Sequence, residues 1–300
     1  IYGDIVSNSF IFTLSLTSSP SLLVYLSTPS SSLPAPVPPG PQPAMVSLPP
    51  VLGVLRLSHG YPTALGDVAC PKSFPYHSLH QRVPGLTFSL CQEGDIDDRL
   101  KEAFVTAVRW LEEQGVSGIT GDCGFMIHHQ ALVRSVTHLP VFLSSLVLLP
   151  SLLTAYSPSR PVAVFTANSN IGSLKTTIHK VCGLEEGEGD GRVLVVGCQH
   201  IPGFEAVALG TAVDLPLVEA GVVALARKVQ RRHPNLAAFL FECTQLPPFS
   251  SAVRRATSLP VWDAVTAADH FIQGSSGRTA AQNWHTLRKK TRKRLNSWAS

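Results

Sequence analysis

Charged side chains are scarce in this 300-residue sequence, making up 15% of it. The first fifty residues carry only one, Asp4, together with ten of the 24 prolines and eleven serines. The apolar stretch 5–27 is interrupted by Ser, Thr and Pro20, so it lacks the run of about 20 apolar residues that spans a membrane. It also lacks the basic segment that begins a secretory signal. We therefore expect residues 1–48 to be a disordered leader, an untranslated segment with the true start at Met45, or a targeting segment.

A basic surface is also lacking, although the formal net charge is +4. Segment 288–294 alone holds six of the 24 Lys and Arg residues, which leaves 18 basic against 20 acidic residues elsewhere. We expect 286–300 to be a disordered basic tail and expect no nucleic-acid partner, because nucleic-acid binding usually needs a basic face on the folded domain.

Paired cysteine motifs are absent. The six cysteines are Cys70, Cys91, Cys123, Cys182, Cys198 and Cys243. Their scatter excludes a disulfide scaffold, and the lack of any C-x-x-C pair excludes zinc-ribbon and thioredoxin-type sites. Free thiols in a reducing compartment follow, with cytoplasm and chloroplast both open. His128 and His129 are adjacent, face different ways on a helix and lack a third ligand at a recognised spacing, so we expect no metal site.

From residue 51 onward, short apolar runs alternate with helical patterns. The strand candidates are 51–57, 117–120, 141–144, 162–166, 193–197, 237–242 and 261–262. Apolar residues spaced by three or four predict a helix over 97–114, and a second helix is expected over 217–233. This alternation predicts an α/β protein with parallel sheets flanked by helices, in which ligands bind beyond the carboxyl ends of the strands.

Two of these strand ends present a cysteine. Cys123 lies in Gly-Asp-Cys-Gly-Phe and Cys243, 120 residues later, in Glu-Cys-Thr-Gln-Leu-Pro-Pro. Each precedes a predicted helix, whose N-terminus lowers the pKa of a thiol and favours thiolate. The like placement suggests two lobes that face each other across a cleft. Asp122 and Glu242 precede the cysteines; they either bond backbone amides, or one of them is itself a base.

These two motifs resemble the cysteine motifs of the aspartate/glutamate racemase superfamily. Further stretches are similar to the algal Alma-type dimethylsulfoniopropionate (DMSP) lyases, and the similarity runs over residues 51–273. These stretches are 53–57, 66–68, 83–88, 115–126, 164–168, 196–199, 202–205 and 259–264.

The resemblance implies a cofactor-independent carbon–sulfur lyase with two pseudo-symmetric Rossmann-like lobes, mainly parallel sheets and an active-site cleft between the lobes. It implies a small-molecule substrate, DMSP, from which β-elimination gives dimethyl sulfide and acrylate. A proton next to a carboxylate is weakly acidic, so its base must be close and aligned, and donors must face the enolate. The alternatives are a cofactor-independent racemase or isomerase of a small carboxylic or amino acid, and a non-catalytic binding protein of this fold.

We expect Cys123 to be the base and Cys243 its partner, or the reverse. The expected donors to the substrate carboxylate are Ser144, Ser145, Thr166, Asn168, Thr244 and the backbone around Gly124. The expected aromatic faces for the sulfonium are Tyr61, Tyr76 and Trp262. We place lobe 1 at 49–145, completed by 264–285, and lobe 2 at 146–263. No membrane span is expected, and a homo-oligomer is left open.

Overall fold

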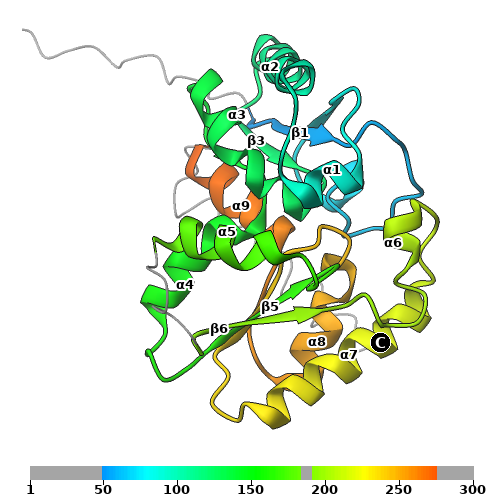
Figure 1. Cartoon of the computed structure of the whole chain (residues 1–300), viewed down its shortest axis with the longest axis vertical. Coiled ribbons are helices and arrows are strands. Elements are labelled where there is room, and N and C mark those ends of the chain that lie inside the picture. Colours follow the sequence, from blue (N-terminus) through cyan, green and yellow to red (C-terminus); the bar gives the residue numbers. More distant parts are fainter. Residues whose placement is uncertain (1–48, 184–190, 276–300) are drawn as a thin grey trace, which may run out of the picture. The chain divides into compact units, whose positions relative to one another are not determined.

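The computed structural model describes residues 49–183 and 191–275 (Figure 1). The predictions made for residues 1–48, 276–285 and 286–300 lie outside the described residues. Within the described ranges, eight strands form two separate four-stranded sheets, and every strand pair is parallel. This confirms the predicted α/β class with two lobes.

The first sheet has the strand order β2-β1-β3-β4. Its strands are β1 (Leu52–Arg56), β2 (Ser78–Arg82), β3 (Gly118–Gly121) and β4 (Val141–Phe142). The second sheet has the order β6-β5-β7-β8. Its strands are β5 (Val162–Thr166), β6 (Val193–Gly197), β7 (Ala238–Phe241) and β8 (Val261–Trp262). The two orders correspond strand for strand, so β1 and β3 occupy the same central places as β5 and β7.

The helices lie along the sheets. They are α1 (Phe88–Glu93), α2 (Asp98–Glu113), α3 (Gln130–Val136), α4 (Leu149–Ala155), α5 (Gly172–Cys182), α6 (Ala206–Leu209), α7 (Leu215–Arg232), α8 (Ser250–Thr257) and α9 (Ala264–Ser275). The described residues also contain four short 3-10 helices, which follow strands: η1 (Pro71–Ser73), η2 (Gly124–His129), η3 (Ser145–Leu148) and η4 (Pro247–Phe249). No helix among the described residues is long and apolar enough to cross a membrane.

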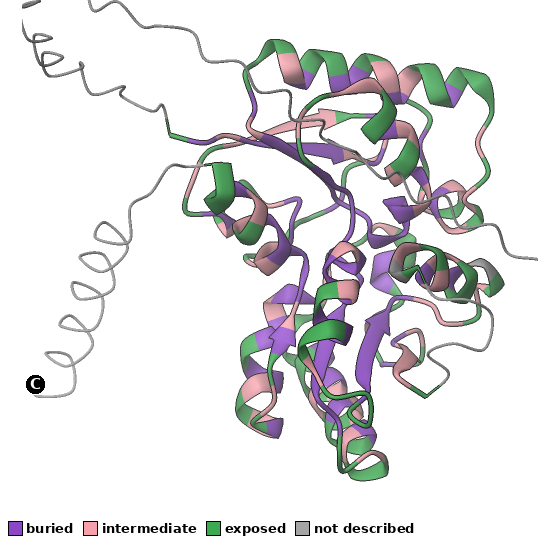
Figure 2. Ribbon diagram, turned by 90° about the vertical axis from the view of Figure 1, so that its left-hand side faces the viewer, coloured by how far each residue is buried: buried purple, intermediate pink, exposed green. Residues whose placement is uncertain are grey.

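The two long helices form where the sequence predicts them. Asp97 caps α2 by accepting a 2.8 Å hydrogen bond from the Leu100 backbone N–H, and Gly115 follows the helix with φ +75°. Asp214 caps α7 in the same way through the Leu217 N–H, 3.1 Å away. Figure 2 shows that such helices bury one face and expose the other.

The core is continuous between the two sheets. Side chains from both sheets, including Ile119 of β3 and Phe241 of β7, belong to one buried cluster. A smaller cluster forms where α9 covers the first sheet, and there the Phe142 and Phe271 rings stack 4.5 Å apart. The last described helix of the chain therefore packs on the sheet with which the described chain begins.

All seven predicted strands are present, with ends that differ by at most two residues from the prediction. The eighth strand, β2, was not predicted. Its sequence Ser-Leu-His-Gln-Arg has no apolar run, and it lies at a sheet edge where its side chains are only half buried or exposed. An edge strand needs fewer apolar residues than a central one, so this strand leaves a weak signal in the sequence.

Candidate functional site

The two cysteines occupy equivalent positions in the two lobes. Cys123 is the second residue after β3, and Cys243 is the second residue after β7. The residues between each strand and its cysteine make matching backbone hydrogen bonds: Asp122 N–H donates to Leu55 O (3.0 Å) and Glu242 N–H to Phe165 O (2.8 Å). The same local backbone therefore presents a carboxyl and a thiol from each lobe.

Both thiols line one small cavity. Its lining consists of Leu57, His59, Tyr61, Phe88, Asp122, Cys123, Gly124, Phe125, Ala167, Val207, Glu242, Cys243, Thr244 and Gln245. Most of these residues follow β1, β3, β5 or β7, so the cavity lies beyond the carboxyl ends of central strands from both sheets. Its volume is about 20 Å³, which is enough for about one water molecule. The cavity is therefore narrow, and a substrate larger than water fits in it only when the lining moves.

Hydroxyl groups join the two lobes beside the cavity. The Thr244 hydroxyl donates a 2.5 Å hydrogen bond to the backbone carbonyl of Asp122, and the Ser145 hydroxyl donates to that of Phe241 at 2.7 Å. We expected both hydroxyls to bind a substrate carboxylate. In this structure, each hydroxyl instead donates its hydrogen bond to a backbone carbonyl at the end of a strand in the other sheet. Both bonds therefore hold the two halves of the site together.

Asp122 has a full set of partners. The Arg56 Nε donates to it at 2.6 Å and the Leu57 backbone N–H at 3.0 Å. Burial raises the pKa of the Asp122 carboxyl, while the guanidinium and the N–H oppose that rise. Of the two roles left open for this residue, the structure supports the one in which the carboxyl bonds backbone and holds its loop.

Glu242 differs sharply from its counterpart. Its side chain is fully buried, and neither carboxylate oxygen makes a hydrogen bond of ordinary geometry to a described residue. The Thr166 hydroxyl and the Ala167 N–H lie close enough to lower its pKa partly, but burial dominates and raises the pKa of Glu242 to about 7. Leu55 and Phe165 occupy equivalent places in the two sheets, and the next residue is Arg56 in lobe 1 but Thr166 in lobe 2. The arginine that pairs with Asp122 therefore has no counterpart beside Glu242.

Burial and the neighbouring groups favour the protonated form of both thiols. The pKa of Cys123 is raised well above its usual value, most by a hydrogen bond with the Cys91 thiol and next by burial. The charges of Cys91, Glu242 and Asp122 raise it further. Burial and then Glu242 raise that of Cys243. We expected a helix N-terminus to lower both values. Cys123 does precede η2, but its side chain makes no hydrogen bond to the start of that helix, and desolvation and the neighbouring groups outweigh six residues of 3-10 helix.

Sequence reasoning assigned Cys91 and Cys198 no role. Cys91 belongs to α1 and hydrogen-bonds Cys123, whereas Cys198 follows β6 and lies near enough to Cys243 to affect its pKa. These contacts arise from packing between elements distant in the chain, and nothing in the local sequence signals them.

Tyr61 is the predicted aromatic residue that reaches the cavity. Its hydroxyl donates to Asp67 Oδ1 at 3.1 Å, and its ring lies 5.8 Å from the Arg56 guanidinium. Burial raises the pKa of Asp67 to about 7, and Asp122 adds to the rise. Two carboxyl groups, Asp122 and Glu242, thus line the cavity, and Asp67 lies behind Tyr61; of the two that line it, Asp122 has an arginine as its partner.

The other predicted substrate-binding residues lie outside the lining. Ser144 caps η3 through the Leu146 N–H, Asn168 accepts from the Asn170 N–H, and Tyr76 donates to Asp269. Thr166 stands behind Glu242, and Trp262 belongs to β8. Gly124 lines the cavity, and the role expected of its backbone as a donor to the substrate stays a prediction.

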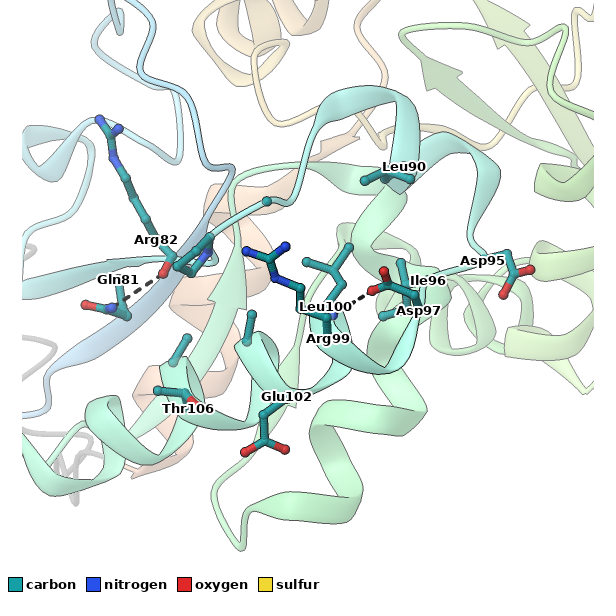
Figure 3. Close-up of a pocket in the computed structure, with 14 residues that line it drawn as sticks. Gln81, Arg82, Leu90, Asp95, Ile96, Asp97, Arg99, Leu100, Glu102 and Thr106 are labelled. Atoms are coloured by element: carbon teal, nitrogen blue, oxygen red, sulfur yellow. Dashed lines mark hydrogen bonds between the residues drawn. The ribbon is translucent and has the colours of Figure 1, made fainter.

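A second hollow, of about 640 Å³, opens on lobe 1 between β2 and α2 (Figure 3). It shares no lining residue with the cavity of the two thiols. Figure 3 shows its charged side chains directed mostly outward, and Asp97 is occupied as the cap of α2. Among the described residues, no group of three or more His, Cys, Asp or Glu side chains is placed to hold a metal ion.

Comparison with known proteins gives several relatives. Dimethylsulfoniopropionate lyase 3 of Emiliania huxleyi (strain CCMP1516) is 48% identical over 243 residues, which cover 79% of this chain and 63% of that protein. The chain therefore spans less than two thirds of that relative. Dimethylsulfoniopropionate lyase of Durusdinium sp. clade D is 45% identical over 238 residues, which cover 78% of this chain and 78% of that protein. No protein-family model matches.

Solved structures share the fold at low sequence identity. A mutant of arylmalonate decarboxylase in its sulfate-associated form has a TM-score of 0.51 at 19% identity, and covers 77% of this chain and 95% of its own. Allantoin racemase from Klebsiella pneumoniae has a TM-score of 0.51 at 15% identity, with 75% and 86% covered. Both are similar to this chain in architecture.

Proposed function

This chain belongs to the dimethylsulfoniopropionate lyase family, and we propose that it eliminates dimethyl sulfide from DMSP to leave acrylate. The relatives confirm the family resemblance seen in the sequence. The observation that carries the proposed mechanism is that Cys123 and Cys243, one from each lobe, line the same cavity.

In the proposed reaction, one thiol of the pair acts as thiolate and removes the proton on the carbon next to the DMSP carboxylate. The electrons of that C–H bond form the double bond of acrylate, and the C–S bond breaks with its electrons on sulfur, so neutral dimethyl sulfide leaves. We assign the base to Cys123 and place Cys243 on the other side of the substrate. A positioned base of this kind contributes about 10²- to 10⁴-fold to rate.

The charge of the cavity supports a substrate with a cationic end. Glu242 is buried without a cation, and Asp67 adds a second carboxyl nearby, so a sulfonium is attracted where a second carboxylate is repelled. The Tyr61 ring offers a face to the sulfonium, worth about 0.5–2 kcal/mol. Aspartate and glutamate carry two carboxylates, so the same charges disfavour the racemase alternative.

Substrate binding also requires the cavity to widen, since about 20 Å³ does not admit DMSP. A sulfonium that enters beside the thiols then lowers their pKa values, because a nearby positive charge favours thiolate. Bound substrate thus increases the fraction of thiolate.

The test is to incubate the purified chain with DMSP and measure dimethyl sulfide in the headspace. We expect release by the wild type, a loss of at least about 10²-fold in Cys123→Ala, and retained activity in Cys70→Ser. Cys70 is the matched control because its thiol lies outside the cavity lining. No sulfide, together with deuterium uptake from heavy water into aspartate or glutamate, would establish the racemase instead.

A further inference from the structure

Elimination from DMSP leaves a proton that the protein must remove. The substrate is a zwitterion, and its products are neutral dimethyl sulfide and the acrylate anion, so each turnover yields one net proton. A racemase returns a proton to its substrate, whereas a lyase has to pass one to solvent. A carboxylate near the thiol can take this proton and so restore the thiolate for the next turnover.

The buried carboxyl of Glu242 is placed for this task. It lines the cavity that both thiols line, and the negative charge of Glu242 affects the pKa of each. It also lies against the residue that follows Cys123, because a Cβ built on Gly124 would be 2.3 Å from Glu242 Oε1. Only glycine at position 124 leaves room for the carboxylate there.

Two further observations separate Glu242 from a structural carboxyl. Neither of its oxygens has a hydrogen-bond partner of ordinary geometry among the described residues, and the nearby Thr166 hydroxyl and Ala167 N–H offset its burial only in part. Its counterpart Asp122 is held by Arg56 at 2.6 Å and by the Leu57 N–H. An unpartnered buried carboxyl is costly to stability, and such groups cluster at functional sites.

We infer that Glu242 accepts the proton of the Cys123 thiol and thereby forms the thiolate base, an inference that rests on the proposed function. The thiol proton moves to the Glu242 carboxylate through a water molecule, for which the shared cavity has room, and this transfer gives thiolate and carboxylic acid. The thiolate then takes the α-proton of DMSP and becomes thiol again, while dimethyl sulfide leaves. Glu242 now carries the net proton, and it releases this proton to water when the cavity opens. Glu242 thus acts through the thiol as a positioning residue.

A purely electrostatic role predicts the opposite result on substitution. The negative charge of Glu242 raises the pKa of both thiols, so removing it would make thiolate easier to form. If the only effect of Glu242 is to raise the thiol pKa values through its charge, Glu242→Gln is faster than wild type near neutral pH. If Glu242 is the acceptor, the same variant is slower, although Gln fills nearly the same space.

The experiment measures kcat/KM for DMSP from pH 6 to 10 in wild type, Glu242→Gln and Glu242→Asp. We expect the wild type to lose rate below about pH 7 as the carboxyl becomes protonated. Glu242→Gln should lose at least about 10²-fold at neutral pH and then gain about tenfold per pH unit, approaching wild type as hydroxide replaces the acceptor. Glu242→Asp should be slower than wild type at every pH but should lose rate below about the same pH as wild type. Equal loss at every pH, or a faster Gln variant, overturns the inference.

A second readout does not depend on turnover. The thiolate ultraviolet absorbance of wild type minus that of Cys123→Ala reports thiolate formation over the same pH range, with no reagent that has to enter the cavity. In wild type we expect the amount of thiolate to rise with pH near pH 7, and we call this rise the limb. In Glu242→Gln we expect no such limb. If wild type shows this limb but makes no dimethyl sulfide, the proposed function fails while the acceptor role stands. If the limb is absent in wild type, the acceptor role is wrong whatever the enzyme's substrate.

Discussion

Replacing Glu242 with Gln should make the stability of the protein less sensitive to pH. The carboxyl titrates at about 7 when folded and near its ordinary 4.5 when unfolded. As pH rises from 4.5 to 7, the unfolded chain loses this proton first, so the free energy of unfolding of the wild type falls. At about 1.4 kcal/mol per pH unit, this group accounts for a loss of about 3 kcal/mol that is complete above pH 7.

The assay is urea unfolding of wild type and Glu242→Gln at pH 5 and pH 8. Asp67 also has a pKa raised to about 7, but it is present in both proteins, so the difference between them isolates Glu242. We expect the stability of the Gln variant relative to wild type to increase by about 3 kcal/mol toward pH 8. The exposed Glu113→Gln serves as the control and should show no such change. A difference that is the same at both pH values would refute the view that Glu242 is buried without compensation.

Three further substitutions test the packing around the site. Gly124→Ala places a methyl carbon 2.1 Å from a carbonyl oxygen across the cavity, so we expect a loss of thermal stability and activity, whereas Gly172→Ala, with nothing within 4 Å, should fold and melt normally. Thr244→Val removes the hydroxyl bonded between the lobes and should cost about 1 kcal/mol by urea unfolding; no change would show that this bond does not join them. Arg56→Met strips Asp122 of its cation and should cost about 3–5 kcal/mol near neutral pH; a cost below 1 kcal/mol would contradict the buried ion pair.

The fold can be predicted from the sequence because its central strands are buried on both faces. Runs such as 162–166 of β5 and 238–241 of β7 consist almost wholly of apolar residues, are fully buried and lie at the centre of the second sheet. The edge strand β2 is polar and leaves no such run. The paired cysteines are also readable, because each follows a buried strand at the same interval and parallel strands bring their carboxyl ends together.

The partners of these cysteines could not be predicted in the same way. Asp122 and Glu242 look equivalent in sequence, and their difference depends on which side chain faces each one from the neighbouring strand end: Arg56 in one lobe and Thr166 in the other. The contact between Cys91 and Cys123 depends on how α1 packs against η2. Hydroxyls expected to meet substrate were instead donated to carbonyls of the other lobe, as with Thr244. Such outcomes are decided by tertiary packing.

The most direct test of the two-thiol site is the rate of dimethyl sulfide release from DMSP by Cys123→Ser, Cys243→Ser and the double variant. Groups that act as a unit in one step show losses that do not add. We predict that each single variant loses at least about 10²-fold and that the double variant is little slower than the slower single one. Near-wild-type release by either single variant, or losses that multiply in the double variant, would contradict a shared site.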